Sequence, residues 1–188
     1  MKGILCSLFF CLSFLMCSPE KPASSSIQTV SLTSDDKDKL LAKIKALEEE
    51  LKEKSKKSLH LPTAQQLLAL SKQFVEAFPK APQTPAILFR TADLARGMGE
   101  YGQAIKYWGL LYNDYSDFEK APDAEFMIAF TYENFLNDKQ QAKGYYERFL
   151  QKYPDHHLAE QVKAILENID KSPEELIKSF QEKRQEKK

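Results

Sequence analysis

The sequence predicts an all-α fold: a short helical solenoid of about three helix pairs with a C-terminal capping helix, preceded by a charged amphipathic or coiled-coil helix. One ladder of apolar and small side chains, at offsets 0, 3, 4, 7, 8 and 11, begins at Leu67, Ala104 and Ala142. This spacing gathers the side chains on one face of a helix. The ladders start 37 and 38 residues apart, which indicates a structural repeat. The chain also has only six glycines among its 188 residues, which favours helices over β-turns.

The composition excludes several classes of function. Lys and Arg number 27, Asp and Glu also number 27, and the formal net charge is zero. This balance argues against whole-chain electrostatic binding, so we expect no nucleic acid as partner. The three cysteines are Cys6, Cys11 and Cys17. The rest of the chain therefore has no disulfide, thiol nucleophile or cysteine-based zinc site.

The N-terminus predicts export. Lys2 precedes an uncharged, mostly apolar run that ends at Met16, and residues 1–16 are predicted to be a signal peptide. The run is shorter than the roughly 20 apolar residues that cross a membrane; an uncleaved N-terminal anchor is the alternative. Cys17 follows the run, and this order resembles a bacterial lipoprotein signal, although Met16 replaces the usual small residue. The resemblance implies that Cys17 is lipidated, which would anchor the chain to a membrane. The other interpretation makes Cys17 one more cysteine of the apolar run.

A tether and a charged helix are predicted next. Residues 17–36 are rich in Ser, Pro, Thr and Asp, which is typical of a flexible tether. Residues 37–58 are predicted to form an amphipathic helix. Its apolar stripe consists of Leu40, Ile44, Leu47 and Leu51. The 4-3-4 spacing is that of a coiled-coil seam, but it lasts only about two heptads. The stripe therefore packs either on the chain's own next helix or on a second copy, giving a homo-oligomer.

Residues 62–170 are predicted to be the repeat domain. Thr63 and Gln66 suggest a capping box before the first ladder, and Pro79 ends that ladder. A helix from Pro85 to Met98 leads through a glycine-rich turn into the second ladder, and a helix opened by Pro122 leads into the third. An amphipathic helix follows over residues 158–169. Ser172 and Glu175 start the capping helix, which is predicted within 172–188 and ends in a polar, frayed tail.

The third ladder resembles the tetratricopeptide repeat at Ala142, Tyr146 and Pro154. The second ladder matches at Ala104 and Trp108, while Ser116 replaces the terminal proline. The resemblance covers residues 63–170 roughly, and it implies paired helices with a non-catalytic role in protein–protein interaction.

The long period, the sequence Tyr-Pro-Asp at 153–155 and Lys-Ala-Pro-Asp-Ala at 120–124 resemble a bacterial cell-envelope branch of these repeats. That branch includes coordinator proteins of the Tol-Pal system and lipoproteins of outer-membrane β-barrel assembly. The resemblance implies a lipid-anchored scaffold on the periplasmic face of a bacterial membrane, above all the outer membrane. Its partners would be other cell-envelope proteins or peptides. The alternative is a soluble periplasmic oligomeric coordinator that uses the coil at 37–58.

No chemical site is expected. The sequence lacks a glycine-rich phosphate loop, a nucleophile elbow and a zinc-binding helix motif, so we expect no enzyme, no cofactor and no metal. His60 lies in a linker, and His156 and His157 are adjacent. On a helix these two neighbours would point about 100° apart and could not share a tetrahedral metal as a pair. We expect solvated or capping histidines.

The remaining candidate is a peptide-binding surface on the concave side, which the first helices of the pairs line. Counting back from Ala104 and Ala142 predicts the residues of this surface. They are Phe89, Asp93 and Arg96 in one helix and Met127, Thr131 and Asn134 in the next, beside Ala86 and Ala124. An extended or helical peptide would bind there, with Arg96 or Asn134 holding a carboxylate or backbone group. A one-residue offset in either helix is the alternative, with Phe89 or Met127 in the core.

Overall fold

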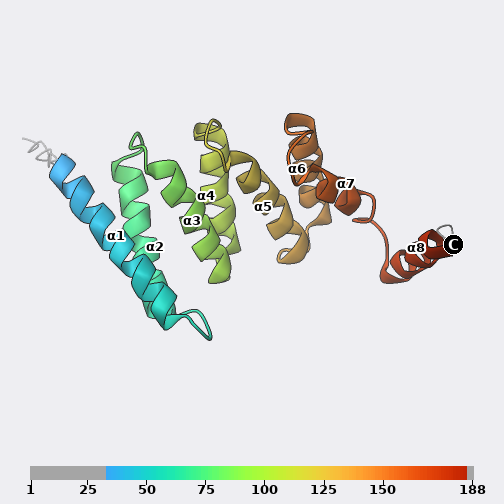
Figure 1. Ribbon diagram of the computed structural model, residues 1–188, viewed down its shortest axis with the longest axis horizontal. Coiled ribbons are helices and arrows are strands. Elements are labelled where there is room, and N and C mark those ends of the chain that lie inside the picture. Colours follow the sequence, from blue (N-terminus) through green and yellow to red (C-terminus); the bar gives the residue numbers. More distant parts are fainter. Residues whose placement is uncertain (1–32, 186–188) are drawn as a thin grey trace, which may run out of the picture. The chain divides into compact units, whose positions relative to one another are not determined.

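The computed structural model of the chain describes residues 33–185. The predicted signal peptide, Cys17 and most of the predicted tether lie outside the described residues. The described part is all-α, as the ladders predict, and its helices follow one another in chain order (Figure 1). The helices are α1 (Ser34–Lys54), α2 (Leu61–Ala77), α3 (Thr84–Gly97), α4 (Tyr101–Asp114), α5 (Ala121–Asn134), α6 (Lys139–Lys152), α7 (Ala159–Leu166) and α8 (Pro173–Gln185).

The helices pack as pairs in a short solenoid. α1 packs on α2, α3 on α4, and α5 on α6, while α2 with α3 and α4 with α5 join one pair to the next. α1 is thus the first helix of the first pair, although the sequence prediction set residues 37–58 apart from the repeat domain. It also starts earlier than predicted. The Thr33 hydroxyl accepts a hydrogen bond from the Asp36 amide at 3.3 Å, and the Asp36 carboxylate accepts one from the Thr33 amide at 2.9 Å.

The apolar stripe of α1 packs on its own chain. Leu40 and Ile44 are 8% and 2% exposed and form a cluster with Leu67, Phe74 and Ile87. Leu47 and Leu51 are partly buried against the same cluster. The stripe was predicted to pack either on the chain's own next helix or on a second copy. The structure shows the first arrangement. The two buried positions therefore present little apolar surface to a second copy.

Thr63 has a different role from the predicted one. α2 begins at Leu61, with Pro62 in its first turn and no side-chain cap. The Thr63 side chain is buried, and its hydroxyl donates to Glu50 Oε1 at 2.9 Å. The predicted capping box with Gln66 is therefore wrong, because Thr63 lies inside the helix and ties α2 to α1.

The core combines small residues with large aromatic ones. Ala92, Ala95 and Ala104 are fully buried around Trp108. Their small side chains let α3 and α4 approach closely, which leaves room for the indole. A second cluster lies between α5, α6 and α7. It contains Phe126, Ala129, Ala142, Tyr146, Phe149, Val162 and Ile169.

Three turns between pairs share one hydrogen-bond pattern. In each, an amide three residues on donates to the carbonyl of Phe78, Tyr115 or Tyr153. The donors are the amides of Ala81, Phe118 and His156. The carbonyls of these same three residues accept hydrogen bonds from the amides of Thr84, Ala121 and Ala159. Ala81, Phe118 and His156 are therefore equivalent positions in successive pairs.

The repeat register changes within the third pair. α3 and α5 begin 37 residues apart, whereas α4 and α6 begin 38 residues apart. The extra residue lies in the turn between α5 and α6, where Asn137 has φ 51°. The shorter turn between α3 and α4 uses Gly99 at φ 81°. The left-handed backbone suits Gly and Asn best, so each turn places one of them there.

The C-terminal helix starts as predicted. The Ser172 amide donates to Glu175 Oε2 at 2.8 Å, and the Glu175 amide donates to Ser172 Oγ at 3.2 Å. Leu176 borders a hollow beside Ile165, while Ile177 is 59% exposed. Within residues 33–185, no helix is both long enough and apolar enough to cross a membrane.

Candidate functional site

A groove separates the first helices of the first two pairs, α1 and α3. One hollow of about 590 Å³ lies toward the start of α3, and a second of about 440 Å³ lies further along it. The apolar lining is Leu41, Ile44, Ala86 and Ile87 in the first hollow, and Leu51, Leu67 and Leu94 in the second. We call the two hollows together the α1–α3 groove. Each is within the size range of ligand pockets.

An ion pair crosses this groove. Glu48, Glu49 and Arg90 border both hollows, so they lie where the hollows meet. Arg90 Nε donates to Glu48 Oε1 at 2.6 Å, and the two side chains are 51% and 31% exposed. An exposed pair of this kind stabilises a protein by only about 0.2–1 kcal/mol. A bound segment could therefore displace it at small cost and run through both hollows.

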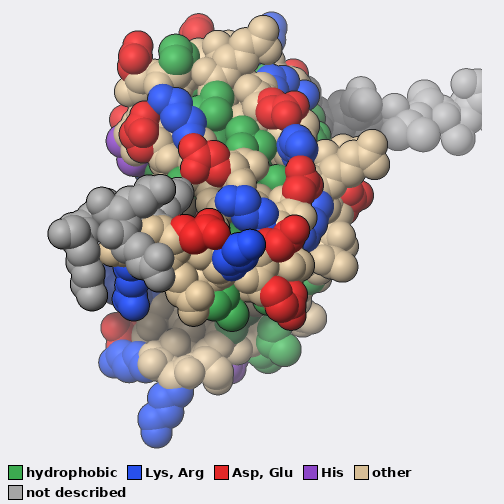
Figure 2. Space-filling model, turned by 90° about the vertical axis from the view of Figure 1, so that its right-hand side faces the viewer, with side chains coloured by type: hydrophobic (Ala, Val, Ile, Leu, Met, Phe, Trp, Pro, Cys, Tyr) green, Lys and Arg blue, Asp and Glu red, His purple; other side chains and the backbone are tan. Residues whose placement is uncertain are grey.

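The rim of the groove carries both signs of charge. Lys45 and Lys52 stand near Glu48, Glu49 and Asp93. Charges are also mixed on the face drawn in Figure 2, where acidic and basic side chains intermingle with apolar patches. The groove therefore offers an apolar floor for side chains and paired charges at its edge, which suits a segment with one apolar side.

Asp93 is a predicted site residue that borders the groove. Its carboxylate Oδ1 lies 3.8 Å from an Arg96 guanidinium nitrogen. Burial raises the pKa of Asp93, and the positive charges of Arg96 and Lys120 partly oppose that rise. A hydrogen-bond donor from a ligand would therefore stabilise this carboxylate.

Phe89 and Arg96 face α5 and the loops at its ends. The Lys120 ammonium lies 5.4 Å from the centre of the Phe89 ring, and the Arg96 guanidinium lies 6.0 Å from that of Phe135. Phe89 is partly buried against the core. These cation–π contacts tie α3 to its neighbour, and a role in binding a partner remains a prediction.

The predicted residues of α5 do not form one exposed row. Thr131 is fully buried, and its hydroxyl donates to the Met127 carbonyl at 2.7 Å. Met127 is partly buried between the two core clusters. Asn134 is exposed and donates to the Phe130 carbonyl at 3.0 Å. Thr131 therefore offers no surface to a partner, in contrast to the prediction.

The extra residue between α5 and α6 explains this difference. Counting back from the ladder of α6 passes through that turn, so each predicted position in α5 falls one residue too far along. With the 37-residue offset of the first helices, the counterparts of Ala86, Phe89, Asp93 and Arg96 are Asp123, Phe126, Phe130 and Glu133. In α5 the predicted surface positions are therefore offset by one residue, which is the alternative that the sequence left open.

Sequence reasoning missed Arg90 and the whole α1 wall of the groove. The reason is that residues 37–58 were predicted as a segment apart from the repeat domain, although Leu40 and Ile44 belong to the same core as α2 and α3. One signal was present. The first ladder is of the second-helix type, so it needs a first helix before it, and the 4-3-4 stripe of α1 supplies that helix.

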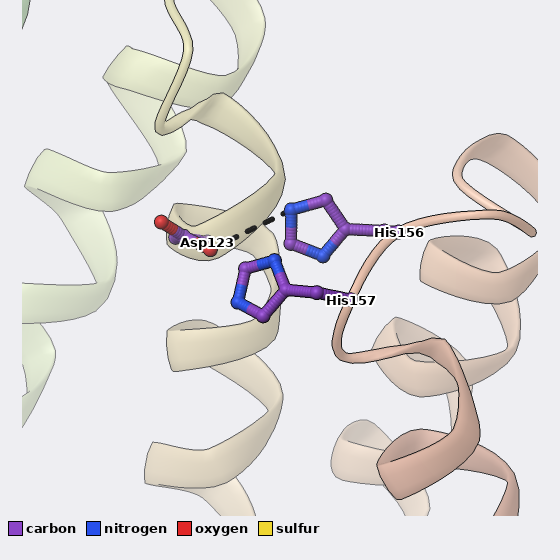
Figure 3. A group of neighbouring side chains, drawn as sticks. All are labelled: Asp123, His156 and His157. Atoms are coloured by element: carbon purple, nitrogen blue, oxygen red, sulfur yellow. Dashed lines mark ion pairs between the residues drawn. The ribbon is translucent and has the colours of Figure 1, made fainter.

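The three histidines occupy two different settings. His60 Nδ1 lies 2.9 Å from the Thr63 hydroxyl. His156 and His157 lie in the turn between α6 and α7, and their ring centres are only 4.2 Å apart. The prediction that these two rings diverge is therefore wrong, because it assumed a helix. Beside them lies Asp123, whose Oδ1 is 3.7 Å from His156 Nε2 (Figure 3).

A buried carboxylate lies at the centre of the third pair. Glu125 has no exposed surface, and its Oε1 accepts from Arg148 Nε at 2.5 Å. The Arg148 guanidinium lies 4.3 Å from the centre of the Tyr145 ring and 5.4 Å from that of Tyr112. The ion pair therefore joins α5 to α6, and the aromatic contact with Tyr112 extends it to α4. The Glu125–Arg148 ion pair therefore has a structural role in the core.

One comparison with known proteins bears on this arrangement. Residues 123–156, which run from the first turn of α5 through α6 into the next turn, match the family model described as tetratricopeptide repeat. No curated protein gives a significant match to the chain. The match and the helix pairs support tetratricopeptide-type repeats in the described residues, and repeats of this type generally mediate protein–protein interaction.

Proposed function

We propose that this tetratricopeptide-repeat chain is a non-catalytic scaffold that binds segments of other proteins in the α1–α3 groove. The observation that carries the proposal is the groove itself, which lies between the first helices of two pairs, where such arrays have their concave side. The segment that fits has apolar side chains on one side and charges of both signs beside them. Asp93 and Arg90 provide a carboxylate and a guanidinium that can hold its polar groups.

The proposed location is the bacterial cell envelope, with a lipid anchor at Cys17. The apolar run up to Met16, the cysteine after it and the Ser/Pro-rich segment that follows support this part of the proposal. Two or more acyl chains on one residue give stable membrane attachment, whereas a single chain binds only marginally. The partners are then other envelope proteins.

Site-specific photocrosslinking in living cells tests the groove. A photoreactive amino acid replaces Ala86, which lines the first hollow, and the control carries it at Gln151, an exposed residue of α6. We expect a defined crosslinked protein from position 86 and none of the same mass from position 151. Crosslinks that are equal at the two positions would contradict the groove.

Labelling with radioactive palmitate tests the anchor independently. We expect the wild-type chain and the Cys11→Ser variant to incorporate the label and the Cys17→Ser variant to lose it. Label that persists in Cys17→Ser would remove the proposed anchor while leaving the groove untouched.

The alternative role, a soluble oligomeric coordinator, relies on the α1 stripe as a seam between copies. Leu40 and Ile44, two of its four residues, are buried within the chain itself. No observation favours an oligomer joined through this stripe, and we therefore propose a monomeric scaffold. Light scattering over a range of concentrations distinguishes the two.

A further inference from the structure

We infer that Asp123, His156 and His157 form a binding site for a transition-metal ion, with zinc as the ion that best fits their donor atoms. We call these residues the Asp–His–His cluster. One donor atom from each residue lies within 4.8 Å of the other two. Figure 3 shows the carboxylate, from the first turn of α5, and both rings, from the α6–α7 turn, gathered around a common space.

The spacing is close to what a tetrahedral ion requires. Bonds of 2.0–2.2 Å place pairs of donor atoms about 3.4 Å apart. The donor atoms lie within 4.8 Å of one another, so the widest pair closes by at most roughly 1.4 Å. Rotation of side chains can supply this movement, since His157 is exposed and Asp123 is only partly buried.

The preceding helix pair offers an internal comparison. Equivalent turns and helices place Ala86, Phe118 and Glu119 where the third pair has Asp123, His156 and His157. The same backbone therefore carries no donor cluster there. The earlier turns have the apolar residues Ala81 and Phe118 at the position of His156, so packing of this turn does not require a histidine. In the third pair, Asp123, His156 and His157 replace the residues of the preceding pair. All three are of types that bind metal ions, and they face one another.

The donor set identifies the class of ion. Two imidazole nitrogens and one carboxylate oxygen are a frequent zinc set, and they leave a fourth position for water or for a donor from a partner. Nitrogen donors disfavour calcium and magnesium, which prefer oxygen.

Two contacts compete with the ion. The Lys120 ammonium lies 3.8 Å from Asp123 Oδ2. The Leu158 amide donates to His156 Nδ1 at 3.3 Å, so the neutral ring carries its proton on Nε2, the nitrogen that faces Asp123. Binding through Nε2 moves that proton to Nδ1 and breaks the hydrogen bond from Leu158. We therefore expect micromolar rather than nanomolar affinity.

The consequence of binding is local stabilisation. Asp123 and His156 are also the first and last residues of the matched repeat. An ion held by both joins the first turn of α5 to the turn that follows α6. Because the folded chain gathers the donors and the unfolded chain does not, binding raises the melting temperature.

Calorimetric titration with zinc chloride tests the inference on the full-length chain in detergent. Cys6, Cys11 and Cys17 are replaced by Ser throughout, because thiols bind zinc themselves. The test variants are His156→Phe, which copies Phe118 and so keeps the turn packed, and His157→Ala. His60→Ala is the matched control, since His60 lies outside the cluster.

We expect one zinc ion per parent chain and affinity weakened at least about tenfold in both test variants. His60→Ala should bind like the parent, and zinc should raise the melting temperature of the parent but not of His156→Phe. Absence of binding in the parent, unchanged affinity in either test variant, or an equal loss in His60→Ala would overturn the site. None of these results bears on the α1–α3 groove.

Discussion

Glu125 is the residue whose position is least expected from the repeat. With the 37-residue offset it stands where the preceding pair has Leu88, and both side chains are fully buried. A buried carboxylate must be paired, and Arg148 pairs with it. The second oxygen, Oε2, has no hydrogen-bond partner among the described residues. The stability of the third pair should therefore depend strongly on Arg148.

The Arg148→Met variant tests this dependence. It leaves the Glu125 carboxylate buried without its partner, and we expect the free energy of unfolding to fall by about 2–4 kcal/mol, somewhat less than for a fully buried pair because Arg148 is half-exposed. The double variant Glu125→Leu/Arg148→Met copies Leu88 and should recover most of the loss. Urea denaturation measures both. A loss below about 0.5 kcal/mol in Arg148→Met, typical of a surface site, would show that the pair contributes little.

Asp93 predicts a pH effect at the groove. Its pKa is raised in the folded chain, so the folded state binds more protons than the unfolded state in the range above the ordinary pKa of about 4. Stability should therefore fall as the pH rises through the raised pKa. The Asp93→Asn variant removes this fall, so its stability relative to wild type should increase between pH 3.5 and pH 7, as urea denaturation at the two values measures. The exposed Asp117→Asn serves as control; a wild-type-like profile in Asp93→Asn would contradict the assignment.

At the scale of elements, α1 decides where the repeat array begins. Its stripe lies on α2 and α3, and Thr63 and Arg90 add polar links to Glu50 and Glu48. We expect Ile44→Ala to lower the free energy of unfolding by about 2–4 kcal/mol, because it leaves a cavity in the first core cluster. The exposed neighbour Lys43→Ala should change it by less than about 0.5 kcal/mol. Chemical denaturation compares the two, and equal effects would mean that α1 does not dock on the array.

The elements show clearly what the sequence could predict. The ladders predicted α2, α4 and α6, and Ser172 with Glu175 correctly marked the start of α8. The register of α5 could not be predicted, because one extra residue in a turn leaves the apolar spacing of both flanking helices intact. Thr63 was misassigned because a hydroxyl near a helix start bonds equally well to a neighbouring helix.

At the scale of the molecule, the candidate site was predicted only in part. Its location on the first helices followed from the repeat, and Asp93 does border the groove. The other half of the groove comes from α1, whose place depends on tertiary contacts with residues of later helices, such as Leu67 and Ile87. The Asp–His–His cluster was also missed. The prediction assumed helical geometry for His156 and His157, whereas both lie in the turn between α6 and α7. Sequence period locates helices, but the groove and the cluster depend on tertiary contacts between them.

We propose the α1–α3 groove as the partner-binding surface of the molecule. Its most direct test is the dissociation constant between the partner captured from position 86 and three chains: wild type, Ala86→Trp and Gln151→Trp. The indole at position 86 fills the first hollow, so we expect binding to weaken by about tenfold or more, equal to about 1.4 kcal/mol, with little change in melting temperature. Gln151→Trp should bind like wild type. Unchanged affinity in Ala86→Trp would show that the partner does not bind in the α1–α3 groove.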